Sequence, residues 1–267
     1  NSSIADKNIS NNRTRILEGI PIAHKDIFCI ENKKTTCGSK MLENFISPYS
    51  SEVYSRLNNL GAITLGKTNM DEFAMGSSNE TSYFGKVFNP INKKYSPGGS
   101  SGGSAAALSS GMTPLELGSD IGGSIRVPAH FCGLFGHKPS YNIISEVGHM
   151  PPPPGQILTG NGLSVAGPLA RSPEDLEIAL DVLVAAQEQD SHAWSLKLPK
   201  ARTTKTSELR IAIWPDEPYA EADEEITKLI KENEKFWAKE GKRITWIKKY
   251  SKIKDVKYSK DDVKIKW

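Results

Sequence analysis

The 267-residue sequence contains only three cysteines, Cys29, Cys37 and Cys132, and they are isolated from one another. Their spacing matches no zinc-binding pattern, and scattered cysteines of this kind are typical of reduced thiols in a cytoplasmic protein. The sequence also lacks a signal peptide and any apolar run long enough to cross a bilayer. We therefore expect a cytoplasmic protein with no metal and no membrane contact, and nothing in the sequence predicts a cofactor.

A basic surface for nucleic acid is missing as well. Lysine and arginine number 34 against 31 aspartates and glutamates, which leaves a formal net charge of +3. Much of this excess falls in the lysine-rich stretch from Lys248 onward, and such runs are usually solvated. Because we find no basic motif interleaved with aromatic residues of the kind that reads RNA, we expect no direct contact with nucleic acid.

Short apolar runs alternate with amphipathic segments along the chain. This alternation favours an α/β domain, with a mixed, mostly parallel sheet covered by helices on both faces. We predict a single domain over residues 1–250 and a Lys/Asp-rich tail over 251–267. The predicted strands cover residues 62–65, 163–166, 209–214 and 244–247, and the predicted helices cover 52–60, 173–186 and 221–240.

Two glycine–serine clusters stand out in what the sequence does contain, at Gly98–Ser104 and Gly122–Ser124. The first cluster precedes an alanine-rich helix that Ser100 or Ser101 can begin, whose first turn presents free N–H groups. The second predicts a turn whose N–H groups form an oxyanion hole beside a serine nucleophile. A structural loop and a phosphate-binding loop are the alternatives, but the lysine of a common phosphate loop is absent after Gly103.

A serine nucleophile needs a group that takes its proton. None of the five histidines lies in a cluster that marks it as a base. Lys25 is a better candidate, because it follows the apolar run Ile20–Ala23 and precedes Ile27 and Phe28. Burial disfavours the ammonium form and lowers the pKa of a lysine from about 10.4, which makes it a base. A solvated or ion-paired lysine is the alternative.

These motifs together resemble the amidase signature family over about residues 17–186. The resemblance is carried by Gly98–Ser104, by the run Gly118–Ala129 and by the Cys132-Gly133 pair. It implies the amidase signature fold, with Ser124 as the acyl-forming nucleophile and Lys25 as the general base. Ser100 is then the bridging serine, which in the family follows a cis peptide bond.

The resemblance also implies roles for neighbouring residues. The N–H groups that hold the oxyanion come from the turn that ends at the nucleophile, and this turn is supported by nearby polar side chains. The oxyanion-hole residues are Ile121, Gly122, Gly123 and Ser124, the supporting residues are Ser101, Asp120 and Arg126, and the residues of the substrate pocket are Met75, Gly76 and Ser77.

The implied reaction is hydrolysis of a small-molecule carboxylic amide to acid and ammonia through an acyl-enzyme. Residues 35–39 and 67–82 instead resemble the A subunit of the glutamyl-tRNA(Gln) amidotransferase, which works with partner subunits. Residues 148–154 and 163–172 resemble general amidases. Because domains of this family run well beyond 267 residues, we expect a fold truncated at its C-terminus, and a catalytically inactive module is the third alternative.

Overall fold

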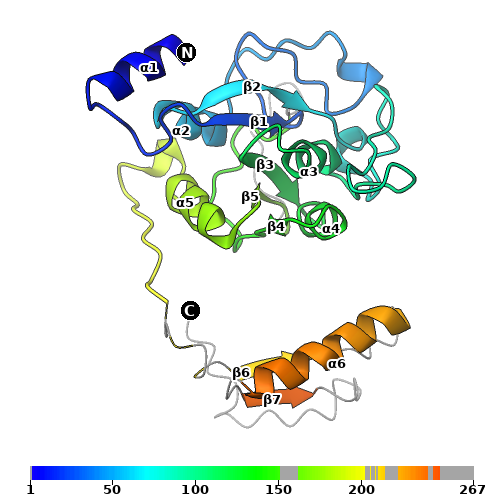
Figure 1. Cartoon of the computed structure of the whole chain (residues 1–267). Helices are drawn as coiled ribbons and strands as arrows, with labels where there is room; N and C mark the ends of the chain where they lie inside the picture. Colours follow the sequence, from blue (N-terminus) through cyan, green and yellow to red (C-terminus); the bar gives the residue numbers. More distant parts are fainter. Residues whose placement is uncertain are drawn as a thin grey trace. The chain divides into compact units, whose positions relative to one another are not determined.

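The computed structural model describes residues 2–150, 162–201, 205, 208, 210–213, 222–239 and 243–246. The chain divides into two compact units, Asn1–Leu198 and Pro199–Trp267, and each is described by itself (Figure 1). We keep the single domain over residues 1–250 as a prediction, alongside this division into two units. The predicted tail, residues 251–267, lies outside the described residues.

A five-stranded sheet in the order β2-β1-β3-β5-β4 forms the centre of the first unit. Strand β1 (Pro21–Lys25) is parallel to both β2 (Ile63–Thr68) and β3 (Leu115–Asp120). Strand β5 (Val165–Ala170) is antiparallel to β3 and to β4 (Phe135–Gly136). The sheet therefore places the C-terminal ends of β1 and β3 next to each other.

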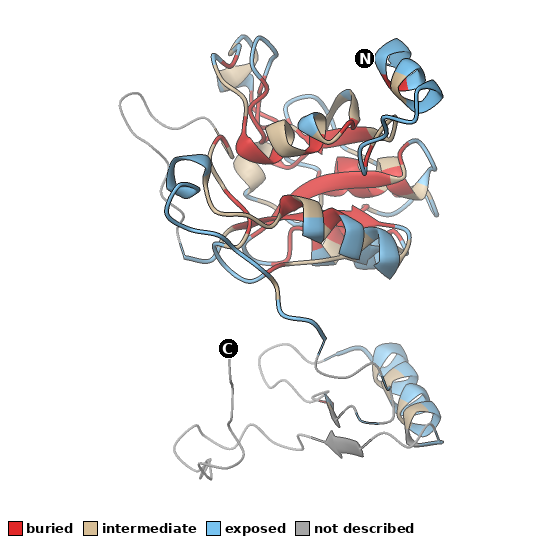
Figure 2. Ribbon diagram, turned by 90° about the vertical axis from the view of Figure 1, so that its left-hand side faces the viewer, coloured by how far each residue is buried: buried red, intermediate tan, exposed pale blue. Residues whose placement is uncertain are grey.

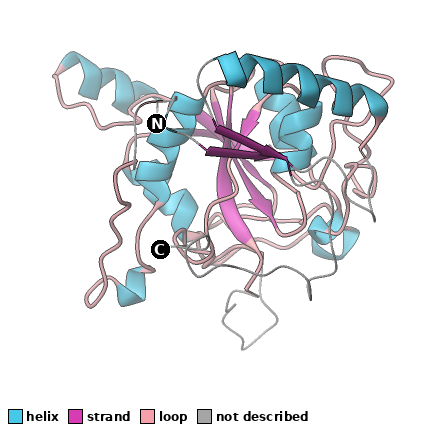
Figure 3. Ribbon diagram, turned by 90° about the horizontal axis from the view of Figure 1, so that it is seen from below, coloured by secondary structure: helices cyan, strands magenta, loops and turns pink. Residues whose placement is uncertain are grey.

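Helices cover both faces of this sheet (Figures 1 and 3). On one face, α2 (Glu52–Asn59) and α5 (Pro173–Leu183) contribute Leu57 and Leu183 to a core that includes Ile22 and Leu117. On the other face, α3 (Gly102–Ser109) and α4 (Arg126–Phe131) pack Leu108 and Ala129 against Leu169. Figure 2 shows the result, a buried sheet between helices whose outer sides are exposed.

The remaining elements lie outside the five-stranded sheet and the four helices that cover it. Helix α1 (Ser2–Ser10) begins the first unit, which also has 3-10 helices at Lys40–Leu42, Glu72–Ala74 and Glu188–Asp190. The second unit pairs β6 (Arg210–Ile213) parallel to β7 (Arg243–Trp246) and carries α6 (Glu224–Lys239). Two of the four pairings in the five-stranded sheet are parallel, and so is the β6–β7 pairing of the separate two-stranded sheet, so the prediction of a mixed sheet, with more parallel than antiparallel pairings over the described strands, is confirmed.

Several predicted boundaries differ from the structure: β2 covers Ile63–Thr68 rather than residues 62–65, and α2 ends at Asn59 rather than at residue 60. Helix α5 ends at Leu183 rather than at residue 186, because Val184 is extended and forms an isolated bridge with Ile144. The strand predicted at 163–166 begins at Val165 and continues to Ala170, through a glycine and a proline. Pairing with β3 along its whole length extends β5 past these poor strand formers.

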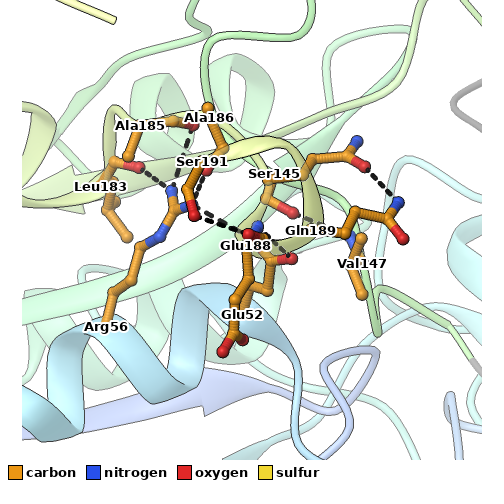
Figure 4. Close-up of polar contacts among 11 residues, drawn as sticks. Glu52, Arg56, Ser145, Val147, Leu183, Ala185, Ala186, Glu188, Gln189 and Ser191 are labelled. Atoms are coloured by element: carbon orange, nitrogen blue, oxygen red, sulfur yellow. Dashed lines mark hydrogen bonds and ion pairs between the residues drawn. The ribbon is translucent and has the colours of Figure 1, made fainter. Parts of the chain in front are cut away.

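The segment after α5 is held to α2 by one arginine and one glutamate (Figure 4). The Arg56 guanidinium donates to the carbonyl of Leu183 at 2.7 Å and also to that of Ala186. Glu52 accepts from Arg56 at 3.1 Å and from the Glu188 N–H at 2.9 Å. These contacts satisfy carbonyls that the end of a helix leaves free, and they set where the chain leaves α5.

Candidate active site

Lys25 is the last residue of β1, and its side chain is fully buried. Its Nζ donates to Ser100 Oγ at 2.6 Å and to Ser119 Oγ at 3.0 Å. Ser119 lies near the end of β3, the parallel neighbour of β1, so the pairing of the two strands brings this hydroxyl to the lysine. The structure therefore brings the predicted base and the predicted bridging serine together.

The environment of Lys25 favours its uncharged form. Burial lowers the pKa of the amine from 10.5 to about 7, while the nearby Asp71, Cys37 and Asp120 act in the opposite direction. A base whose pKa lies near neutral pH can both take and return a proton efficiently. The electrostatics therefore suit the predicted role of Lys25.

The peptide bond between Gly99 and Ser100 is cis, as the family resemblance implied. Gly99 has no room for a side chain, because a Cβ atom there would overlap the Asp71 carboxylate and lie 2.8 Å from the Ser78 amide nitrogen. The glycine before the bridging serine is thus required by a close approach of backbone to a buried carboxylate.

Ser101 joins the two glycine–serine clusters. Its N–H donates to the Ser124 carbonyl at 3.2 Å, and its hydroxyl donates to the Ser119 carbonyl at 3.3 Å. Ser101 also occupies the N-cap position of α3, where its side chain makes no capping hydrogen bond. Its hydroxyl is directed to β3, so its supporting role is to hold the helix start against the strand that leads to Ser124.

The turn that presents Ser124 is organised around the Asp120 carboxylate. This carboxylate accepts from the N–H groups of Gly123 at 2.8 Å and Ile125 at 3.0 Å, and it forms an ion pair with Arg126 at 3.0 Å. Burial alone raises the pKa of Asp120, but the hydrogen bonds from Arg126 and from the backbone together lower it to about 2. Asp120 is therefore ionised at neutral pH, and its contacts are compatible with the supporting role that we predict for it and Arg126.

One predicted oxyanion-hole donor is already engaged. The Gly123 N–H donates to Asp120 at 2.8 Å, so this donor is engaged in the structure, and its place in the oxyanion hole stays a prediction. The N–H groups of Ile121, Gly122 and Ser124 donate to no acceptor within the described ranges. These three donors remain available for a developing negative charge.

Ser124 itself is 7% exposed. Its hydroxyl forms no hydrogen bond with the part of the chain that the structure describes, and none joins it to Ser100. Of the two contacts in the predicted relay, the structure has the one between Lys25 and Ser100. It has no hydrogen bond between Ser100 and Ser124.

Two polar residues beside Lys25 were not predicted from the sequence, Ser119 and Asp71. Ser119 directly precedes Asp120 and lies two residues after Leu117, so the two residues share one face of a strand. This spacing was the signal in the sequence that could have placed Ser119 near the site. No local signal marked Asp71. Of the predicted pocket residues, Met75 is 81% exposed, and Gly76 approaches the Asp71 carboxyl so closely that a Cβ would lie 2.5 Å from its Cγ.

The described residues hold no metal site at or around this centre. The three cysteines are buried free thiols, and the described residues contain no cluster of histidine, cysteine and carboxylate side chains suited to a metal. A groove of about 810 Å³ runs beside β2, past Lys67 and its ion-pair partner Asp26, but it is not lined by Lys25, Ser100 or Ser124. Within the described ranges, no helix is long and apolar enough to span a membrane.

Comparison with known sequences places this site in a family. A family model described as Amidase matches residues 2–255. The A subunit of the glutamyl-tRNA(Gln) amidotransferase of Methylobacillus flagellatus is 48% identical over 232 residues, which cover 85% of this chain and 45% of that protein. The protein of the same name from Nitrosomonas europaea is 52% identical, over 71% of this chain and 38% of that protein. The chain thus spans less than half the length of these relatives.

Solved structures show the same fold. The A subunit of the glutamyl-tRNA(Gln) amidotransferase of Thermotoga maritima matches with a TM-score of 0.77 and 35% identity, covering 86% of this chain and 50% of that one. The peptide amidase of Stenotrophomonas maltophilia matches with a TM-score of 0.75 and 26% identity, covering 92% of this chain and 51% of that one. Because the family model matches nearly the whole chain and the fold agrees, the chain belongs to the amidase signature family.

Proposed function

We propose that this chain carries the acylation centre of an amidase, which cleaves a carboxylic amide to an acid and ammonia. The observation that supports this most strongly is the 2.6 Å contact between the buried Lys25 Nζ and Ser100 Oγ. An amine with a pKa of about 7 in contact with a serine hydroxyl is the arrangement of a general base.

In the proposed reaction, neutral Lys25 takes the proton of Ser100 while Ser100 takes the proton of Ser124. The Ser124 oxygen then bonds to the amide carbon, and the N–H groups of Ile121, Gly122 and Ser124 hold the resulting oxyanion. The C–N bond breaks as the relay returns the proton to the leaving ammonia. Water then hydrolyses the ester, which releases the acid and restores Ser124. This sequence requires the Ser124 hydroxyl to turn toward Ser100.

A second candidate function is the ammonia-releasing component of a glutamyl-tRNA(Gln) amidotransferase. The observation that favours it is the 48–52% identity to A subunits of that enzyme. The substrate would then be glutamine, and partner subunits would use the ammonia. Since the chain spans less than half of these relatives, an inactive module is the outcome if the remaining half is needed for catalysis.

Ammonia release tests the proposal. We expect the purified chain to release ammonia from simple aliphatic amides at least about 100-fold faster than its Ser124→Ala variant, since covalent and acid–base catalysis are lost together. Equal rates would exclude Ser124 as the nucleophile. Release from glutamine only in the presence of amidotransferase partner subunits and tRNA would favour the second candidate.

A further inference from the structure

Asp71 is a fully buried carboxylate beside the bridging serine. Its own N–H donates to the Ser100 carbonyl at 3.3 Å. Its side chain accepts from the Asn79 N–H at 2.9 Å and from the Thr81 hydroxyl at 2.8 Å. The residue therefore connects the cis dipeptide with the loop over residues 76–81, which begins with two of the predicted pocket residues.

Two glycines make this position possible. A Cβ at Gly99 would overlap the Asp71 carboxylate, and a Cβ at Gly76 would lie 2.6 Å from Asp71 Oδ1. The carboxylate thus packs between the backbone before Ser100 and the backbone of the pocket loop. Only residues without a side chain allow both approaches, so the three positions form one unit.

The charges around Lys25 give Asp71 an electrostatic role as well. The ionisable groups that act on Lys25 are Asp71, Cys37, Asp120 and His149. Burial raises the pKa of Cys37 to about 12, and burial with the Lys25 charge lowers the pKa of His149 to about 3, so both are uncharged at neutral pH.

The two carboxylates near Lys25 differ in their partners. Asp120 is paired with Arg126 at 3.0 Å. Asp71 has no cationic partner in any of the described ranges, and its acceptors are occupied by neutral donors. Asp71 is thus the uncompensated anion beside the base.

We propose that Asp71 is a positioning residue that fixes the pocket loop to the cis dipeptide and so places beside Lys25 a carboxylate that has no cationic partner in the described ranges. The inference rests on the proposed function only in taking Lys25 as the base. Burial lowers the pKa of Lys25, and the Asp71 charge raises it. The pKa of the base therefore stays in a range that suits neutral pH. The same carboxylate sets the wall of the pocket relative to the relay.

The titration of Lys25 tests this directly. NMR of the chain with ¹⁵N-labelled lysine, with the Lys25 signal assigned by its loss in Lys25→Met, gives the midpoint without any substrate. We expect Asp71→Asn to lower this midpoint by about one pH unit, because it removes an opposite charge that acts on the Lys25 amine. Glu72→Gln is the matched control, because it removes a charge one residue away, and it should leave the midpoint in place. An unchanged midpoint in Asp71→Asn would overturn the proposal.

A measurement on the unaltered chain covers the case in which Asp71→Asn does not fold. The ¹³C signal of the Asp71 carboxyl should shift at the Lys25 midpoint, and this step should vanish in Lys25→Met. Absence of the step would overturn the proposal equally. Neither readout depends on Ser124, so failure of the amidase proposal, seen as equal ammonia release in Ser124→Ala, is distinguished from failure of this one.

Discussion

The Lys25 amine contacts two hydroxyl groups, and only one of them lies on the proposed path of the proton. Ser100 is the acceptor at 2.6 Å that joins the relay, while Ser119 at 3.0 Å holds the amine from the neighbouring strand. Ser119 is buried and its backbone is tied to Ser101. We therefore propose that its hydroxyl orients the base and that the proton passes through Ser100.

Substitution of Ser119 by alanine should weaken the base rather than abolish it. We expect the rate of Ser124 acylation to fall by about 10-fold, the effect of losing one hydrogen bond to a charged group. Ser119→Thr keeps the hydroxyl and should retain most of the rate. The measurement is the rate of ammonia release for the three proteins at equal concentration. A threonine variant as slow as the alanine variant would show that packing, and not the hydroxyl, accounts for the loss.

Residue identities at the centre could be predicted to different degrees. Lys25, Ser100 and Ser124 lie in local motifs whose residue types carry the chemistry, so they were accessible from the sequence. Ser119 comes to Lys25 through the pairing of β3 with β1, and Asp71 comes to Ser100 through a backbone contact between segments distant in sequence, so neither contact follows from a local pattern. The Gly123 N–H was assigned to the oxyanion because the turn was predicted without the direction in which the Asp120 side chain points.

Among the elements, the turn from β3 into α4 determines how Ser124 is presented. Five donor groups from three residues converge on the Asp120 carboxylate. They are the backbone N–H groups of Gly123, Ile125 and Arg126 and two nitrogens of the Arg126 guanidinium. The backbone donors are buried within the turn, whereas the Arg126 side chain is 53% exposed. The backbone contacts should therefore contribute more than the ion pair, since exposed pairs are screened by solvent.

Asp120→Asn should destabilise this turn, because the amide cannot accept from all of these donors. We expect a loss of about 2 kcal/mol in the free energy of unfolding at pH 7, where the carboxylate is ionised. Since the pKa of Asp120 is lowered from 3.8 to about 2, this contribution is complete above pH 3.8 and is lost as pH falls toward 2. Urea denaturation measures it, with Arg126→Ala as the comparison. Equal losses in the two variants would contradict the dominance of the backbone contacts.

Helix and strand positions followed from apolar periodicity and caps where those signals were strong. Pro173 begins α5, as predicted, and Ser172 before it accepts from the Asp175 N–H at 3.1 Å. The end of α5 was missed because a bridge from Val184 to Ile144 and the Arg56 contacts, both distant in sequence, terminate the helix. Helix α4 was missed because its six residues include a proline and carry little periodic pattern.

For the whole molecule, the most unusual feature of the core is a carboxyl group in the central strand. Glu116 of β3 is 1% exposed, accepts from the Thr113 hydroxyl at 2.7 Å, and has one oxygen without a partner within the described part of the chain. Burial raises its pKa from 4.5 to about 7, against smaller effects of its hydrogen bonds. The folded chain thus binds this proton more tightly than the unfolded chain.

Stability of the first unit should therefore fall as pH rises from about 4.5 through 7, where the unfolded chain has already lost the proton. The loss in the free energy of unfolding across that interval should be on the order of 2–3 kcal/mol, and Glu116→Gln should remove this dependence on pH. Urea denaturation at pH 5 and pH 8 measures it, and the exposed Glu80→Gln is the control. A wild-type chain that is equally stable at both pH values, with Glu116→Gln unchanged, would contradict a buried proton at this site.

The relation of this chain to its family also belongs to the scale of the molecule. The described sheet has the fold of amidase signature proteins, yet the chain covers about half of each of the matching solved structures named above. The fold class could be predicted because strands and helices alternate. The division into two units could not, because it depends on contacts across the chain rather than on local composition.

The central claim is that Lys25, acting through Ser100, makes Ser124 nucleophilic. The most direct measurement is the rate at which a fluorophosphonate modifies Ser124, followed by mass spectrometry from pH 5 to pH 9. We expect modification of Ser124 alone, at a rate that rises with pH through about 7 as Lys25 loses its proton, and a fall of about 100-fold or more in Lys25→Met and Ser100→Ala. Modification at another residue, or equal rates in the three proteins, would contradict it.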